Sequence, residues 1–312
     1  MPRLVSIRDH FVASLGEFCG TFLFLFFAFG GTQTANMSSS TATVSTGPNL
    51  QQLTYISLVF GFSLAITVWI FFRVSGGLFN PAVTLSLCIT GVVPPLRSAF
   101  LLVSQIVGAV AAAAVVKCII PAPEVMFNVQ LTKGMSVAQG LFLEMFLTTE
   151  LVFTILMLAA EKTKATFVAP VGIGLALFVA ELFGVYWTGG ALNPARAFAP
   201  NVVMGSFPGY HWIYWLGPAL GSLLASGFYA LIKFLNYEEV NGDQDKASDE
   251  EKTIGSSRND YEGRNPKTVS QIREPRDSRR SQTSQRSPRQ TAGEQNRHSN
   301  TPHYEQYDHY QN

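Results

Sequence analysis

Six long apolar segments constrain this chain more than any other feature of its sequence. They lie near residues 12–34, 52–73, 97–118, 138–160, 167–187 and 212–235. Each is about as long as the roughly 20 apolar residues that a helix needs to cross about 30 Å of hydrocarbon. Only helices and closed barrels satisfy every backbone polar group within lipid, and barrel strands need only about half this length. The sequence therefore predicts an all-α membrane protein with six transmembrane helices.

The charged residues divide the chain into a membrane part and a tail. Residues 1–236 contain only 10 of the 22 Lys and Arg residues and 7 of the 21 Asp and Glu residues. The segment 237–312 holds the rest and has almost no large aliphatic residues, so it cannot bury enough apolar surface to offset the entropy lost on ordering. We predict a short cytoplasmic N-terminus over 1–10, a membrane domain over 11–236, and a disordered cytoplasmic tail over 237–312.

Basic residues near the ends of the apolar segments indicate how the chain is oriented. If the chain crosses the membrane six times, most of these basic residues fall on the same side as the two termini. They are Arg3, Arg8, Arg73, Arg97, Lys162 and Lys164. Lys and Arg residues close to membrane helices favour the cytoplasmic side. Both termini are therefore predicted to be cytoplasmic.

The membrane part contains an internal repeat with an offset of 113 residues. With this offset, Asn80-Pro81-Ala82 falls on Asn193-Pro194-Ala195, Ser75-Gly76-Gly77 on Thr188-Gly189-Gly190, and Gly61 on Gly174. The repeat halves, about 11–118 and 138–236, have three spans each, so the second half must insert with the opposite orientation. Inverted repeats of this kind place their functional site near the midplane, where interrupted helices meet.

Each Asn-Pro-Ala motif opens an apolar stretch about half a membrane long, near 80–90 and 193–204. Asparagine suits the N-cap of a helix and proline its first position. We predict two re-entrant half-helices that start at Pro81-Ala82 and Pro194-Ala195 and meet end to end. Helix N-termini carry partial positive charge and free N–H donors, so this junction would repel cations. The Asn80 and Asn193 amides would donate hydrogen bonds to a neutral molecule there.

These motifs resemble those of the aquaporin (major intrinsic protein) family, and of its orthodox fungal members in particular. The matching stretches are Gly16–Phe18, Ser75–Thr84, Thr188–Arg196 and His211–Trp215. The resemblance covers roughly residues 10–236 and implies a homotetramer in the lipid bilayer with one pore per subunit. It also implies a multi-pass channel, expected in the plasma membrane, that passes water or small neutral solutes and excludes protons and ions.

The resemblance further implies an outer selectivity filter made by Phe60, Glu181, Gly190 and Arg196. An arginine buried at membrane depth is costly and is usually functional. Gly190 stands where water-selective members often carry Cys or Ala, so we expect that side of the constriction to be open. Glu181 stands where those members carry His. It would lower the barrier to cations beside Arg196, and would either bridge to the arginine or leave a wider pore; the alternative is a Glu181 turned away from the lumen.

Two further carboxylates in the apolar segments, Glu17 and Glu144, are expected to be structural. Irregular backbone at membrane depth needs buried polar partners. The resemblance implies that each of these residues supports the loop before one half-helix.

The leading functional prediction is a passive channel for water, with hydrogen peroxide as a further candidate permeant. The alternatives are a broader pore for glycerol, urea or ammonia, and a non-conducting membrane protein used for adhesion or as a receptor. An enzyme is not expected, because the sequence has neither a His, Cys and Asp cluster with ligand spacing nor a nucleotide-binding loop. No cofactor, metal or nucleic-acid partner is predicted.

Overall fold

The computed structural model describes residues 7–39, 47–161 and 164–242. This part is helical and contains no strand, and six of its helical segments are long and apolar enough to span a membrane. They are α1 (Ile7–Ser39), α2 (Leu50–Phe71), α4 (Pro95–Ile119), α5 (Val137–Ile155) with the π-helical turn η1 (Leu156–Ala160), α6 (Ala169–Thr188) with the 3-10 turn η2 (Lys164–Val168), and α8 (Ile213–Phe234). The predicted fold class is confirmed.

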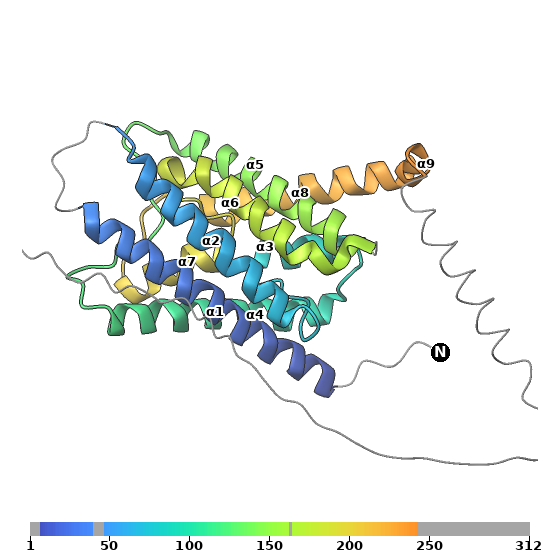
Figure 1. The fold of residues 1–312 in the computed structure, drawn as a ribbon, viewed down its shortest axis with the longest axis horizontal. Helices are drawn as coiled ribbons and strands as arrows, with labels where there is room; N and C mark the ends of the chain where they lie inside the picture. Colours follow the sequence, from blue (N-terminus) through green and yellow to red (C-terminus); the bar gives the residue numbers. More distant parts are fainter. Residues whose placement is uncertain (1–6, 40–46, 162–163, 243–312) are drawn as a thin grey trace, which may run out of the picture. The chain divides into compact units, whose positions relative to one another are not determined.

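Two short helices, α3 (Pro81–Ile89) and α7 (Pro194–Met204), begin at the two Asn-Pro-Ala motifs. In Figure 1 they lie between the long helices and run inward from opposite ends of the bundle. The α3 helix packs against α8, and α7 packs against α4, so each short helix contacts a long helix of the other repeat half. The two halves are therefore interlocked.

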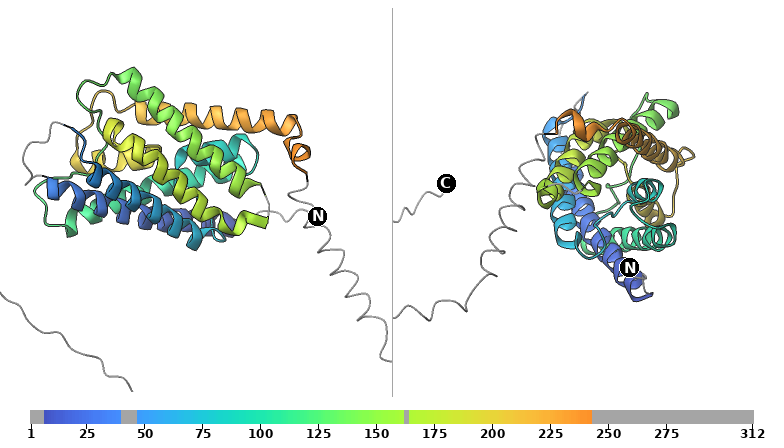
Figure 2. Two further views of the ribbon diagram at one scale, coloured as in Figure 1. Left: turned by 45° about the horizontal axis from the view of Figure 1, so that its top comes forward. Right: turned by 90° about the vertical axis from the view of Figure 1, so that its right-hand side faces the viewer.

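The long helices pack in pairs that repeat the offset of the sequence. The α1 helix packs against α4 as α5 packs against α8, and α2 packs against α6 across the repeat (Figures 1 and 2). Gly61 and Gly174 face each other at the α2–α6 crossing: a Cβ atom on Gly61 would lie 2.8 Å from the Gly174 carbonyl oxygen. Small residues allow such close backbone approach between membrane helices.

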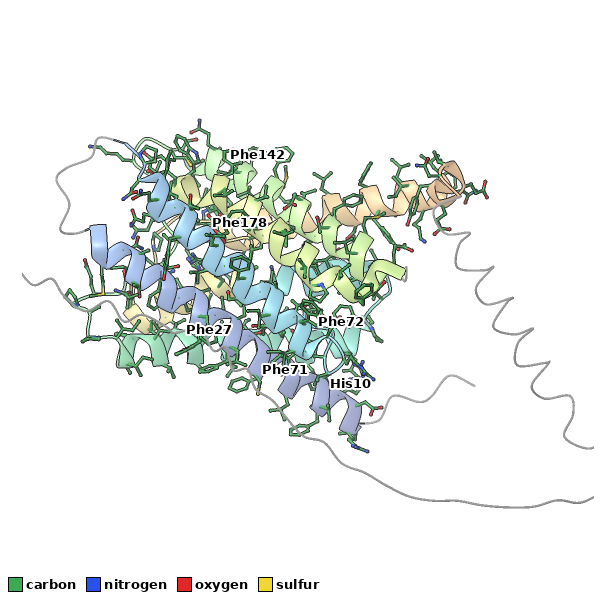
Figure 3. The ribbon with its side chains drawn as sticks, viewed as in Figure 1. His10, Phe27, Phe71, Phe72, Phe142 and Phe178 are labelled. Atoms are coloured by element: carbon green, nitrogen blue, oxygen red, sulfur yellow. The ribbon has the colours of Figure 1, made fainter. Side chains whose placement is uncertain are left out.

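The outer faces of the bundle are apolar, as lipid contact requires. Phe27 on α1 and Phe142 on α5 project from the bundle and are 58% and 52% exposed (Figure 3). By contrast, the buried polar side chains Gln105, Thr148 and Ser222 lie inside the bundle. This pattern places apolar surface outside and polar groups inside, as expected for a protein in lipid.

The described part ends with a short helix, α9 (Tyr237–Val240), just past the predicted end of the membrane domain. Lys233 of α8 pairs with Glu238 of this turn at 2.6 Å and with Glu161 at 2.9 Å. The first of these pairs ties the short helix to the end of α8. The remainder of the predicted tail, like residues 1–6, lies outside the described residues.

Candidate functional site

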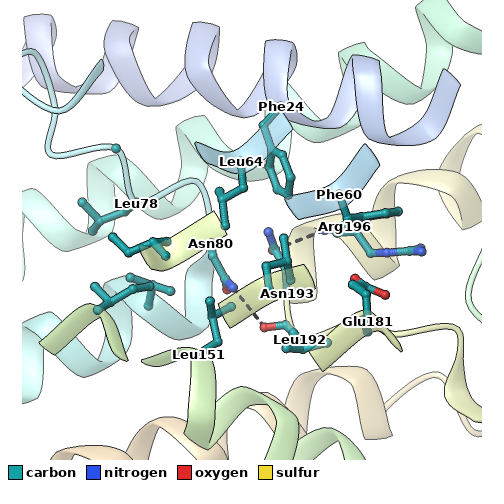
Figure 4. Close-up of a pocket in the computed structure, with 16 residues that line it drawn as sticks. Phe24, Phe60, Leu64, Leu78, Asn80, Leu151, Glu181, Leu192, Asn193 and Arg196 are labelled. Atoms are coloured by element: carbon teal, nitrogen blue, oxygen red, sulfur yellow. Dashed lines mark hydrogen bonds between the residues drawn. The ribbon is translucent and has the colours of Figure 1, made fainter. Parts of the chain in front are cut away.

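A narrow cavity lies where the two short helices meet the long ones. Figure 4 shows its lining, which includes five of the predicted site residues: Asn80, Asn193, Phe60, Glu181 and Arg196. The other predicted residues do not line it and instead support its walls. They are Pro81, Ala82, Pro194, Ala195, Gly190, Glu17 and Glu144.

Each short helix is capped by its asparagine, as the motif predicts. The Asn80 Oδ1 atom accepts a hydrogen bond from Ala82 N at 2.8 Å, and Asn193 Oδ1 accepts from Ala195 N at 3.0 Å. The prolines occupy the first helical position, where no N–H is needed. The Asn side chains are therefore fixed by their oxygen atoms, and their amide nitrogens point away from the helix.

The two amide nitrogens join the short helices across their junction. Asn80 Nδ2 donates to the Leu192 carbonyl at 3.0 Å (Figure 4). Asn193 Nδ2 donates to the Phe79 carbonyl at 2.8 Å. An amide nitrogen carries two hydrogens, so one remains on each side chain for another acceptor. The junction therefore presents two fixed donors to the cavity instead of two fully free amides.

Glu17 and Glu144 are fully buried and bind the two loops that precede the short helices. Glu17 accepts hydrogen bonds from Ser75 Oγ, Leu78 N and Phe79 N at 2.6, 3.0 and 2.8 Å. Glu144 accepts the matching set, from Thr188 Oγ1, Ala191 N and Leu192 N at 2.6, 2.9 and 2.8 Å. The donors in the two sets are separated by the same 113 residues, so the internal repeat extends to individual hydrogen bonds.

Arg196 is buried on α7, with 2% of its surface exposed. Its Nη1 donates to the Phe127 carbonyl and its Nη2 to the Gly189 carbonyl, both at 3.1 Å. Its guanidinium carbon lies 4.9 Å from the centre of the Phe60 ring, within the range of a cation–π contact. The guanidinium is thus held beside an aromatic ring, and its Nε has no hydrogen-bond partner among the described residues.

Glu181 lines the cavity beside Arg196 (Figure 4). Its carboxylate occupies the space next to Gly190. A Cβ atom on Gly190 would lie 2.0 Å from Glu181 Oε2. The open side that we expected at Gly190 is not found, because the carboxylate fills it. Glu181 and Arg196 form no direct ion pair, and neither carboxylate oxygen bonds any other group of the described chain. The bridged arrangement, one of the alternatives for this pair, is absent.

Three aromatic residues complete this end of the cavity and were not found by sequence reasoning. Phe24 lines the cavity next to Phe60, with their rings in edge-to-face contact. Phe127 supplies a carbonyl to Arg196 and stacks on Phe29. None of the three belongs to a motif. Each takes its place only when α1 packs against α2 and α4 and the 120–136 connection reaches Arg196.

The opposite end of the cavity is lined by aliphatic side chains. These are Leu64, Leu78, Val83, Leu151, Ile155, Ile173 and Leu177. Within the described ranges, no three His, Cys, Asp or Glu side chains gather where they could bind a metal ion. The chemistry that this site offers is hydrogen bonding at the junction and at Glu181 and Arg196, between apolar walls.

Comparisons with known proteins agree with this geometry. A family model described as "Major intrinsic protein" matches residues 5–229. Aquaporin-2 of Botryotinia fuckeliana (strain B05.10) is 66% identical over 246 residues, which are 78% of this chain and 65% of that protein. Aquaporin-7 of the same fungus is 59% identical over 241 residues, which are 76% of this chain and 53% of that protein. The chain thus spans less than two thirds of the length of these two relatives.

A solved structure shares the fold. The aquaglyceroporin from Plasmodium falciparum superposes with a TM-score of 0.61 at 21% identity, over 70% of this chain and 95% of that one. The relatives found by sequence are much more similar to this chain than this structure is, and the family assignment rests on them. The chain belongs to the major intrinsic protein family, the family of the aquaporins, whose members are passive membrane channels and not enzymes.

Proposed function

We propose that this protein is a passive channel that conducts water and hydrogen peroxide in single file and excludes protons and ions. The observation that carries the proposal is the junction of α3 and α7, where two helix N-termini meet and each asparagine keeps one amide hydrogen for a permeant. The partial positive charge of the two N-termini disfavours cations. The fixed donors orient the oxygen of a neutral molecule toward the junction.

The walls on either side of the junction support small neutral permeants. On one side only aliphatic residues such as Leu78, Leu151 and Ile155 line the cavity, so a permeant there bonds mainly to its neighbours in the file. On the other side Phe24 and Phe60 narrow the passage and Arg196 adds a fixed positive charge. We propose that Phe60, Glu181, Gly190 and Arg196 together form the selectivity filter.

The broader pore for glycerol, urea or ammonia is the less favoured candidate. Its main support from the sequence was the missing side chain at Gly190, and the Glu181 carboxylate occupies that space. A non-conducting adhesion or receptor role is also less favoured, because it gives no reason for a buried arginine and two aligned half-helices at membrane depth.

We further propose that the protein forms a homotetramer in the plasma membrane with both termini in the cytoplasm. The family resemblance supports the tetramer. The orientation is supported by Arg73, which follows α2, and Arg97, which lies in the first turn of α4. The end of α2 and the start of α4 lie at the end of the bundle where α1 begins (Figure 1). This arrangement places the Arg196 filter toward the outside of the cell.

Purified full-length protein in liposomes tests the proposal by stopped-flow light scattering and a peroxide-sensitive dye inside the vesicles. We expect faster osmotic shrinkage than in empty liposomes, faster peroxide entry, little glycerol entry, and no proton leak. Osmotic shrinkage no faster than in empty liposomes would show that the chain is not a water channel.

A further inference from the structure

We propose that Glu181 and Arg196 form a two-point binding site for hydrogen peroxide in the outer filter, and that Gly190 provides the space in which the carboxylate stands. The inference rests on the proposed function and specifies how one level of the pore would distinguish peroxide from water. The proposal is based on the hydrogen bonds that three kinds of group make or lack: the Glu181 carboxylate, Arg196 Nε and the backbone carbonyls around them.

Two buried polar groups that line the same cavity have no hydrogen-bond partner in the part of the chain that the structure describes. Both oxygens of Glu181, which is fully buried, accept no hydrogen bond from the described chain, and Arg196 Nε donates none. Buried polar atoms are almost always paired, because an unpaired one loses its bonds to water without replacement. An acceptor and a donor left free in one cavity are therefore ready to bind a small molecule that has both.

Glu181 is the side-chain acceptor at this level of the cavity. The carbonyls of Phe127 and Gly189 each use one lone pair to accept a hydrogen bond from Arg196. An arginine side chain offers donors only, and the rings of Phe24 and Phe60 offer neither donors nor strong acceptors. Without the carboxylate, a hydroxyl group that passes here would meet no charged acceptor.

Hydrogen peroxide matches this pair of groups. One of its O–H groups would donate to a Glu181 oxygen while its other oxygen accepts from Arg196 Nε–H. A water molecule must donate and accept through one oxygen, whereas peroxide donates through one oxygen and accepts through the other. Because Glu181 and Arg196 form no direct ion pair, the longer molecule can span the gap between them better than water can. No bond of the solute breaks, and it leaves unchanged.

Gly190 is coupled to this site by packing. Its φ is +57°, and any Cβ atom there would overlap Glu181 Oε2 at 2.0 Å. An alanine at this position must therefore push the carboxylate out of its place. Gly205 provides a matched control, since its φ is +66° and a Cβ atom there would have nothing within 4 Å.

The experiment compares peroxide and water permeability of full-length variants in liposomes. Glu181→Gln keeps the size of the side chain and replaces one acceptor oxygen by a donor nitrogen, and the loss of one hydrogen bond is equivalent to roughly a fivefold change. We expect the ratio of peroxide to water permeability to fall by about that factor, with water still conducted. Glu181→Leu, which removes both acceptors, should lower the ratio at least as far.

The glycine variants test the coupling. Gly190→Ala should lower the peroxide-to-water ratio as Glu181→Gln does, and Gly205→Ala should not. In a Glu181→Ala background, where no carboxylate can be displaced, Gly190→Ala should have no further effect on the ratio. Size-exclusion profiles of each variant show that the protein is still folded.

Different failures point to different conclusions. A wild-type protein that conducts water but not peroxide, or a Glu181→Gln variant that keeps the wild-type ratio, would overturn the peroxide site and leave the water channel intact. A Gly190→Ala effect that persists in the Glu181→Ala background would overturn the coupling. A wild-type protein that conducts neither solute would instead reject the proposed function itself.

Discussion

At the residue scale, two carboxylates explain how unfavourable backbone is kept at the centre of the molecule. Phe79 and Leu192, one before each Asn-Pro-Ala, have φ values of 51° and 49°. Residues other than glycine rarely adopt such values. Glu17 and Glu144 hold these two residues by their N–H groups, and the Phe79 and Leu192 carbonyls are then turned to accept from the asparagines. The strained residues therefore connect the buried acids to the junction.

The Glu144→Gln variant tests this connection. A glutamine offers one acceptor oxygen where the carboxylate offers two, so at least one buried donor among Thr188, Ala191 and Leu192 loses its partner. Leaving such a group unpaired costs about 1–3 kcal/mol, and we expect a lower unfolding temperature in detergent. Glu150→Gln, at an exposed position of the same helix, serves as the control. Equal melting temperatures for the two variants would contradict a structural role of Glu144.

His211, just before α8, makes stability depend on pH. Burial lowers the pKa of His211 below its ordinary value of 6.5. Its Nδ1 lies 3.4 Å from the Asn201 amide nitrogen, and the ring of Phe207 is 5.0 Å away. The folded state favours the neutral His211 ring, and this preference adds to the stability of the fold. The added stability is present above the ordinary pKa of histidine and is lost as pH falls through the lowered pKa of the folded state.

We therefore expect the unfolding temperature to fall as the pH drops below about 6.5, the ordinary pKa of histidine. The His211→Asn variant should reduce this fall, since it cannot take up the proton. A pH profile identical to the wild type would assign the change to other groups.

At the scale of elements, close backbone contacts fix how the helices cross. The Gly61–Gly174 contact joins α2 and α6, and Gly108 and Gly221 repeat the offset of 113 residues. A Cβ atom on Gly108 would lie 2.6 Å from the Phe18 carbonyl oxygen, and one on Gly221 would lie 2.5 Å from that of Met145. The repeat therefore preserves the contact points between helices, as well as the motifs at their ends.

Gly174→Ala should separate α2 from α6. Its Cβ atom would lie 2.5 Å from the Gly61 carbonyl oxygen and 2.5 Å from Ala65 Cβ, both of which are rigid neighbours. Overpacking of this kind costs about 1–3 kcal/mol, so we expect a lower melting temperature and reduced water permeability. Gly30→Ala in α1, where a Cβ atom meets nothing within 4 Å, should leave both properties close to wild type.

At the scale of the whole molecule, the sequence predicts the features whose signals are local along the chain. Apolar length gives the six spans, and the Asn-Pro-Ala motifs give the starts of α3 and α7, because both signals are local. The position of Glu181 is not local. It depends on the missing Cβ of Gly190 and on the hydrogen bonds that hold Arg196 to Phe127 and Gly189. Such contacts bring distant segments together and leave no pattern along the chain.

The positions of the cavity residues predict which part of the chain can be removed without a loss of permeability. Every residue that lines the cavity lies between Phe24 and Arg196, and the helices that support them end at Phe234. A chain that ends at Gly242 should therefore keep the wild-type water permeability per channel in liposomes, measured by stopped flow at matched protein content. A chain that ends at Asn236 also loses the exposed Lys233–Glu238 pair, which contributes about 0–1 kcal/mol, so its melting temperature should change little. Lower permeability of the chain ending at Gly242 would instead show that residues 243–312 act on the pore.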